Sequence, residues 1–165
     1  MEKEHTYRSS LVWTGNLGVG TRSYRAYDRS YTISIEAKAD IHGSSDPAFR
    51  GDPSKPNPEE LLLSALSSCH MLWYLHLCAE AGVTVTGYSD NAFGSMVEET
   101  DGRGQFSGVV LYPIVFVERE DMIGKAMALH QEANDRCFIA RSVNFPVQHV
   151  PVVRVELSVN EKNSW

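Results

Sequence analysis

One segment, residues 57–82, limits what this chain can fold into more than any other. It reads NPEELLLSALSSCHMLWYLHLCAEAG and is the longest continuous apolar run in the sequence. Asn57 suits the N-cap of a helix, Pro58 suits its first position, and Glu60 completes an Asn-x-x-Glu capping box. Gly82 suits the left-handed residue just beyond a helix end. The segment therefore predicts a helix of about 23 residues, about 35 Å long.

The predicted helix is apolar nearly all round, and such helices are either buried in a protein core or span a membrane. Polar side chains interrupt the run more often than is typical of a membrane-spanning helix. They are Ser64, Ser67, Ser68, His70, His76 and Glu80. We therefore expect a buried central helix.

Length and charge narrow the class of protein further. The chain has 165 residues, which suits a single domain over residues 1–165 with a substantial core. Its net charge of −6 argues against nucleic acid or an anionic membrane as a partner, because both select basic surfaces. The N-terminal sequence MEKEHTYRSS is too polar for a signal peptide. We expect a cytoplasmic protein.

Alternating and amphipathic patterns predict the remaining elements. Strands are expected over residues 6–14, 23–27 and 31–39, then over 83–92 and 105–118, and finally over 152–159. Residues 41–56 are expected to form a loop, and residues 120–136 a second helix. The order βββ-α-ββ-α-β predicts an α+β fold with antiparallel sheets around the long central helix.

The positions of the cysteines separate them by geometry. Cys69 and Cys78 are nine residues apart on one predicted helix, which places them on opposite faces and about 13 Å apart along the axis. A disulfide requires Cα atoms within about 7 Å, so these two cannot pair. If the two helices pack together, Cys69 and Cys137 are the pair to consider. Cys78 is expected to be a small buried hydrophobic residue.

Two other uses of these residues stay open. A metal site could draw on several cysteines and histidines, although their spacings match no standard structural zinc pattern. These residues are Cys69, His70, His76, Cys78 and His130. A Cys/His acyl-transfer site with His130 or His149 as the base is also possible, although no local signature supports it.

Two cysteine-containing segments resemble motifs of one known family. NPEELLLSALSSCHMLWYL places Cys69 ten residues after Glu59, and HQEANDRCFIARSV contains Cys137. Both segments resemble the motifs of the OsmC/Ohr family of organic hydroperoxide reductases and osmotically inducible peroxidases. The resemblance implies an OsmC-like fold with Cys69 as the peroxidatic cysteine and Cys137 as the resolving cysteine. It also implies that Glu59 orients an active-site arginine. The sequence HMLW after Cys69 marks a divergent branch.

The arginine itself is matched less closely. In the Ohr branch it lies in an N-terminal glycine-rich turn, where this chain has Asn16-Leu17-Gly18. In the OsmC branch it lies just ahead of the central helix, where Arg50 is the nearest equivalent. Arg22 and Arg25 are the alternatives.

The resemblance implies an enzyme that reduces organic hydroperoxides with thiols, without a metal or an organic cofactor. It also implies an intertwined homodimer and an external dithiol reductant. The physical chemistry agrees, since only the thiolate attacks a peroxide, and at a pKa near 8.5 only about 3% of a thiol is ionised at neutral pH. An adjacent guanidinium could lower that pKa by about 1–3 units and raise the reactive fraction up to roughly thirtyfold.

The apolar side chains of Leu66, Leu72, Trp73 and Phe138 would favour bulky organic hydroperoxides over hydrogen peroxide. One alternative is an OsmC-like dimer that binds an apolar ligand or performs other thiol chemistry without peroxidase activity. Another is a dimeric scaffold in which the cysteines are inert.

Overall fold

The structure, a computed structural model, describes residues 3–155 of the chain. It contains two compact units, Met1–Leu62 and Leu63–Trp165. The long helix α1 (Pro58–Glu80) begins in the first unit and continues into the second.

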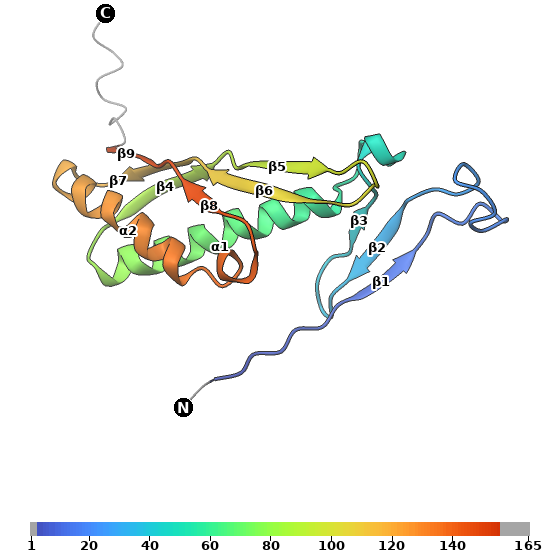
Figure 1. Cartoon of the computed structure of the whole chain (residues 1–165). Coiled ribbons are helices and arrows are strands. Elements are labelled where there is room, and N and C mark those ends of the chain that lie inside the picture. The colour runs from blue at the N-terminus through green and yellow to red at the C-terminus, as the bar shows by residue number, and fades with distance from the viewer. Residues whose placement is uncertain (1–2, 156–165) are drawn as a thin grey trace, which may run out of the picture. The chain divides into compact units, whose positions relative to one another are not determined.

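The first unit contains a small antiparallel sheet in the order β1-β2-β3 (Figure 1). Its strands are β1 (Ser10–Trp13), β2 (Tyr31–Ser34) and β3 (Ile41–Gly43). Tyr31 pairs with Trp13 on one side and with Gly43 on the other. A Cβ atom at Gly43 would lie 2.3 Å from Cζ of Tyr31, so glycine is required where the ring crosses β3. Strand β3 lies in a segment that the sequence predicted as loop.

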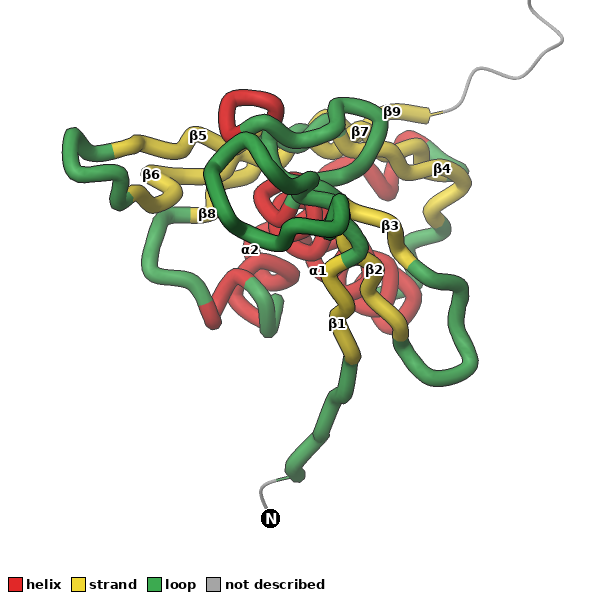
Figure 2. Tube along the Cα trace, turned by 90° about the vertical axis from the view of Figure 1, so that its right-hand side faces the viewer, coloured by secondary structure: helices red, strands yellow, loops and turns green. Residues whose placement is uncertain are grey.

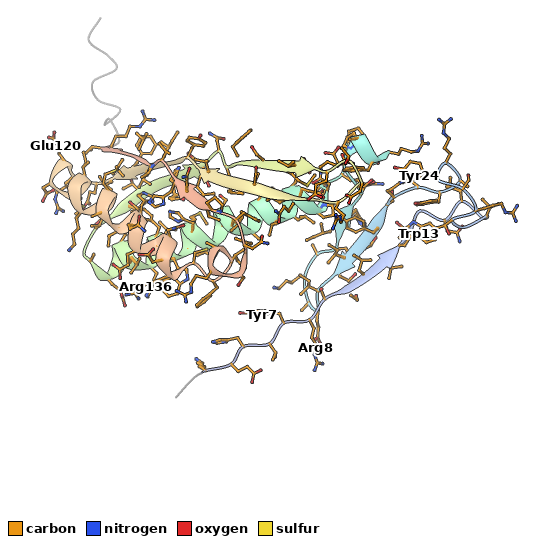
Figure 3. All side chains as sticks on the ribbon, viewed as in Figure 1. Tyr7, Arg8, Trp13, Tyr24, Glu120 and Arg136 are labelled. Carbon is orange, nitrogen blue, oxygen red and sulfur yellow. The ribbon has the colours of Figure 1, made fainter. Side chains whose placement is uncertain are left out.

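The strand predicted over residues 23–27 is wrong, because this segment forms turns. Arg29 accounts for the turns, since its guanidinium donates hydrogen bonds to the carbonyl oxygens of Tyr27 at 2.6 Å and Tyr24 at 2.7 Å. The same guanidinium lies 4.3 Å from the ring centroid of Tyr24 and 4.2 Å from that of Tyr27. Figure 3 labels Tyr24 and Trp13 in this region.

The predicted caps of α1 are confirmed. Asn57 Oδ1 accepts a hydrogen bond from the backbone N–H of Glu60 at 2.8 Å, and the Glu60 carboxylate accepts one from the backbone N–H of Asn57 at 3.0 Å. At the other end Gly82 has φ 72°, and the amide of Val83 donates to the carbonyl of Cys78 at 2.9 Å. This is the hydrogen bond of a Schellman motif, which ends a helix at a left-handed glycine.

Helix α1 buries one face rather than its whole circumference. The buried residues are Leu66, His70, Tyr74, Leu77 and Cys78, spaced as a single helical stripe. Leu72 on another face is 63% exposed. By length and composition alone α1 could also cross a membrane, a test that the core helices of globular proteins pass equally.

The second unit contains two three-stranded sheets, in the orders β4-β7-β9 and β5-β6-β8. Their strands are β4 (Val85–Asp90), β5 (Phe93–Glu98), β6 (Gly104–Leu111), β7 (Pro113–Val117), β8 (Val147–His149) and β9 (Val152–Val155). Both sheets are mixed, because β8 pairs with β6 and β9 pairs with β7 in parallel. The single strand predicted over residues 105–118 is divided at Tyr112, and its halves belong to different sheets.

Helix α2 (Ile123–Arg136) follows the short 3-10 helix η2 (Glu120–Met122). Helices α1 and α2 lie on the same side of the strands of the second unit (Figures 1 and 2). The main core joins α1, α2 and β7, with Tyr74, Leu77, Val115, Val117 and Ala126 among its buried side chains. The η2–α2 segment begins and ends near Glu120 and Arg136, which Figure 3 labels.

The predicted α+β class with two helices is confirmed. The expectation of antiparallel sheets is wrong for the second unit, whose two sheets are mixed. The order also differs, since four strands rather than two separate the helices and, among the described residues, two rather than one follow α2. Two further 3-10 turns are η1 (Pro47–Phe49) and η3 (Ala140–Ser142). The end of the last predicted strand, residues 156–159, lies outside the described residues.

Candidate functional site

The first candidate residue, Cys69, lies midway along α1 with its side chain partly exposed. Its sulfur lies near the Cys137 thiol and helps to raise the pKa of that thiol. The structure therefore brings together the two cysteines that the family motifs single out, as two free thiols.

Cys137 occupies the C-cap of α2 and is only 1% exposed. Its sulfur accepts a hydrogen bond from the Ala140 amide at 3.4 Å. Burial raises the pKa of the Cys137 thiol to about 11, with a further contribution from the neighbouring Cys69 sulfur. Cys137 is therefore a protonated thiol at neutral pH, held against a partly exposed one.

Apolar side chains neighbour the two cysteines along the chain. Leu72, one turn beyond Cys69 on α1, is 63% exposed, and Phe138, next to Cys137, is 65% exposed. The ring of Trp73 contacts Phe138 edge-on, with centroids 5.5 Å apart. The guanidinium of Arg136 lies 5.8 Å from the Trp73 ring and pairs with Glu132. We call Leu72, Trp73 and Phe138 the apolar rim.

Cys78 has a different environment, as its geometry predicts. It is 1% exposed and packs in the main core with Tyr74 and Val83. Burial raises the pKa of its thiol, an effect that the neighbouring Tyr74 hydroxyl partly offsets. Such a thiol is a poor nucleophile, because the thiolate is the reactive form.

The histidines do not assemble the alternative sites. Among residues 3–155, no group of three histidine, cysteine, aspartate or glutamate side chains is arranged to hold a metal ion. His76 is exposed and lies 3.6 Å from Glu80, away from the thiols. His70 and His130 hydrogen-bond to each other at 3.0 Å. Within the described part of the chain, no hydrogen bond joins a histidine to Cys69 or Cys137, so the Cys/His acyl-transfer arrangement lacks its base.

The charged candidates belong to the first unit. Glu59 lies in the first turn of α1 and is partly buried. The pKa of Tyr31 is raised mainly by burial of its own hydroxyl and, to a smaller extent, by the negative charge of Glu59. Arg50 is exposed and follows η1 with φ 66°, a left-handed conformation that is uncommon outside glycine. Arg22 and Arg25 are exposed. The structure assigns none of these arginines to the thiols.

Sequence reasoning missed two features. Arg29 was not considered, although tyrosines at positions 24 and 27 offered the aromatic and carbonyl partners that it uses. The contact between His70 and His130 was also missed. Its one signal was the presence of a histidine within the apolar stripe of each helix.

The chain is similar to known proteins in sequence and in fold. A family model described as OsmC-like protein matches residues 51–150. An OsmC-like protein of unknown function from Vibrio cholerae is 27% identical in sequence, with a TM-score of 0.80 over 90% of this chain and 100% of that one.

Two more distant structures have the same fold. An OsmC-like protein from Mycoplasma pneumoniae is 15% identical, with a TM-score of 0.70 over 93% of this chain and 100% of that one. An organic hydroperoxide resistance protein from Elizabethkingia anophelis is 13% identical, with a TM-score of 0.68 over 94% of this chain and 100% of that one. Comparison with curated protein sequences gave no match. The family match covers more than half of the chain, which therefore belongs to the OsmC-like family.

Proposed function

We propose that the protein is a thiol-dependent peroxidase that reduces organic hydroperoxides through Cys69 and Cys137. The observation that carries the proposal is that a partly exposed thiol on α1 lies near a buried thiol at the C-cap of α2. Membership of the OsmC-like family, which includes structural relatives described as organic hydroperoxide resistance proteins, supports it.

The reaction balances with these two residues and an external dithiol. The Cys69 thiolate attacks one peroxide oxygen, the O–O bond breaks, and the alkoxide leaves and takes up a proton to become an alcohol. Cys69 is then a sulfenic acid. The Cys137 thiol attacks its sulfur, forming the Cys69–Cys137 disulfide and releasing water. A dithiol from outside the chain reduces this disulfide by exchange and is itself oxidised.

The protonated state of Cys137 suits the first step. Before the peroxide arrives, a buried neutral thiol beside Cys69 places no second negative charge next to the attacking thiolate. The apolar rim of Leu72, Trp73 and Phe138 offers contact area to an organic substituent and little to hydrogen peroxide. The apolar rim therefore favours an organic hydroperoxide as the substrate.

The proposal includes a second copy of the chain. Leu11 and Val12 project to opposite faces of β1 and are 64% and 60% exposed. A sheet with exposed apolar residues on both faces is unstable in water unless another surface covers it. We infer a homodimer in which an arginine, Arg50 or one of its alternatives, is oriented by Glu59 and lowers the pKa of the reacting thiol.

The test is thiol titration before and after one equivalent of cumene hydroperoxide. Wild type should lose two thiols rapidly and retain the third, with the new disulfide mapped to Cys69 and Cys137. Cys69→Ser should not react, while the matched control Cys78→Ser should react like wild type. Slow, unselective loss of all thiols would contradict the proposal.

The apolar rim also fits a second function, binding of an apolar ligand without peroxidase activity. Titration of an environment-sensitive apolar dye would detect such binding at Trp73 by fluorescence transfer. Saturable binding that Leu72→Ser weakens, together with no peroxide consumption, would favour this function.

A further inference from the structure

The second unit contains a buried pair of histidines that the proposed reaction does not use. His70 of α1 is 1% exposed and His130 of α2 is 0% exposed. His70 Nε2 lies 3.0 Å from His130 Nδ1, and the two rings are within 7° of parallel. We call these two residues the histidine pair. Among the described residues, this is the one hydrogen bond between nitrogen or oxygen atoms that joins α1 to α2.

The histidine pair lies close in sequence to both thiols. His70 directly follows Cys69, and its side chain projects about 100° away around the helix, so it does not meet the sulfur. His130 precedes Cys137 by seven residues, about two turns of α2. The ring of Tyr74, from α1, stacks on His130 with centroids 3.9 Å apart. The pair therefore fixes the two helices against each other beside the point where their thiols meet.

The hydrogen bond depends on protonation. A neutral imidazole has one N–H and one free lone pair, whereas a protonated imidazole has two N–H groups and no acceptor. The bond therefore forms between two neutral rings or one neutral and one charged ring, and it is lost when both are charged. Burial lowers the pKa of His70 to about 4, helped by His149, and burial lowers that of His130 to about 3, helped by His70 and His149.

Other titratable groups face the pair from each neighbouring element. His149 of β8 lies with its ring centroid 5.6 Å from His70 and 6.1 Å from His130. Burial lowers the pKa of His149, and Asp135 of α2 partly opposes this shift. Tyr74, and Tyr88 of β4 beyond it, have pKa values raised by burial and stay neutral. No described carboxylate contributes to the shift at either member of the pair, so a charge there would be poorly compensated.

We propose that His70 and His130 are positioning residues of the redox step, whose hydrogen bond sets the separation of the Cys69 and Cys137 thiols and is weakened by acid. This rests on the proposed function in taking these two thiols as the reacting pair. It is testable without peroxide, because glutathione disulfide can oxidise the same pair. In that exchange, two protein thiols become one disulfide, and glutathione disulfide accepts two electrons and two protons to become two glutathione thiols.

The measured quantity is the effective concentration of the thiols in glutathione redox buffers, read after acid quench by mass. At pH 7, His130→Leu should lower it about tenfold, because an unpaired His70 remains buried and the helices shift to relieve it. The conservative variants keep the hydrogen-bonding atom and remove the titration. In His70→Gln the amide replaces Nε2, and in His130→Asn it replaces Nδ1. Both should stay within about threefold of wild type.

The pH arm uses the wild type and the His70→Gln/His130→Asn double variant. Between pH 6.5 and pH 3 the effective concentration of the wild type should fall relative to that of the double variant, mainly below pH 4, where the second ring of the pair also becomes charged. Any ionisation of the thiols is common to both proteins, so the ratio isolates the histidines. A small diselenide catalyst keeps the exchange at equilibrium in acid.

Each outcome is decisive. If His130→Leu unfolds more readily but its effective concentration equals that of wild type, the pair is core packing and the proposal is wrong. Should His130→Leu not fold, the two amide variants and the pH ratio decide alone. A wild type that forms the Cys69–Cys137 disulfide with glutathione but does not consume peroxide would overturn the proposed function and leave the positioning role intact. A wild type that never forms this disulfide would overturn the positioning role.

Discussion

The two compact units differ most in what they bury. Every buried hydrophobic side chain of the described residues belongs to the second unit, from Leu66 to Cys137. In the first unit the buried polar residues are Ser44 and Asn57, while Leu11 and Val12 are exposed. The second unit thus has an apolar core of its own. A segment of about 60 residues without one gains too little from burial to hold a fixed fold.

The candidate chemistry is divided in the same way. The thiols and the histidine pair are in the second unit, and Glu59, Arg50, Arg22 and Arg25 are in the first. Thiol exchange can be predicted from the contacts of the second unit alone. The proposed activation of the thiol by a guanidinium instead draws on arginines of the first unit, which has no buried hydrophobic side chain among the described residues. We therefore expect the second unit to determine whether the disulfide forms, and the first unit to affect the rate of the peroxide reaction.

The largest expected effect is acid destabilisation of the second unit. His70 has a folded pKa of about 4 and an unfolded value near 6.5. Because the folded pKa is the lower one, its contribution to stability is complete above pH 6.5 and is lost as the pH falls toward 4. The loss is on the order of 3 kcal/mol.

Urea unfolding at pH 7, 5 and 4, monitored at Trp73, measures this loss. The control is the His70→Gln/His130→Asn variant, whose stability should change little over the same range. Asp52 does not interfere, because serine and lysine hydrogen bonds lower its pKa to about 2, so its own window lies below pH 4. An equal loss in wild type and variant would contradict the assignment to the histidines.

How far the sequence predicts this molecule depends on whether the determining contacts are local. The caps at Asn57 and Gly82 are local, and the bounds of α1 follow from them closely. The strand expected over residues 31–39 ends at Ser34, because the chain turns through Ala37 at φ 59°. Strand β8 has three residues and is defined by parallel pairing with β6, which no local pattern shows.

The division of the predicted strand at Tyr112 also has a non-local cause. Asp90 accepts a hydrogen bond from the Tyr112 amide at 2.7 Å, and its other oxygen accepts one from Ser67 of α1. In the site, helix geometry separated Cys69 from Cys78, and packing of the two helices paired Cys69 with Cys137. That His70 would meet His130 depends on the rotation of α2 about its axis, which the sequence does not specify.

The next effect concerns the rate of the peroxide reaction. If Arg50 lowers the pKa of the reacting thiol, Arg50→Met should slow the reaction with cumene hydroperoxide by up to about thirtyfold at pH 7. Arg22→Met and Arg25→Met test the alternatives, and stopped-flow tryptophan fluorescence gives the rate constants. Arg103→Met is the matched control, since Arg103 is an exposed arginine paired with Asp101. If none of the three variants exceeds the control, activation does not come from Arg50, Arg22 or Arg25.

A smaller effect is expected on assembly. Leu11→Ser removes an exposed apolar side chain from β1, and if a partner chain covers this sheet the dimer should weaken about tenfold. Sedimentation velocity over a dilution series measures the change. Leu17→Ser is the control, because Leu17 is 69% exposed but lies in the turn region outside the sheet. A dimer unaffected by Leu11→Ser would show that the first unit is stabilised in another way.

The smallest effect concerns the start of α1. Asn57→Ala removes the acceptor for the Glu60 amide and should cost about 1 kcal/mol. Glu60→Ala removes the reciprocal bond to the Asn57 amide and should cost less, because Asn57 Oδ1 still caps the helix. Thermal unfolding is followed in a variant that retains Trp13 as its single tryptophan, and again in one that retains Trp73. Since the cap belongs to the unit without an apolar core, Trp13 should report the larger shift. Equal shifts at both tryptophans would mean that the long helix makes the two units unfold together.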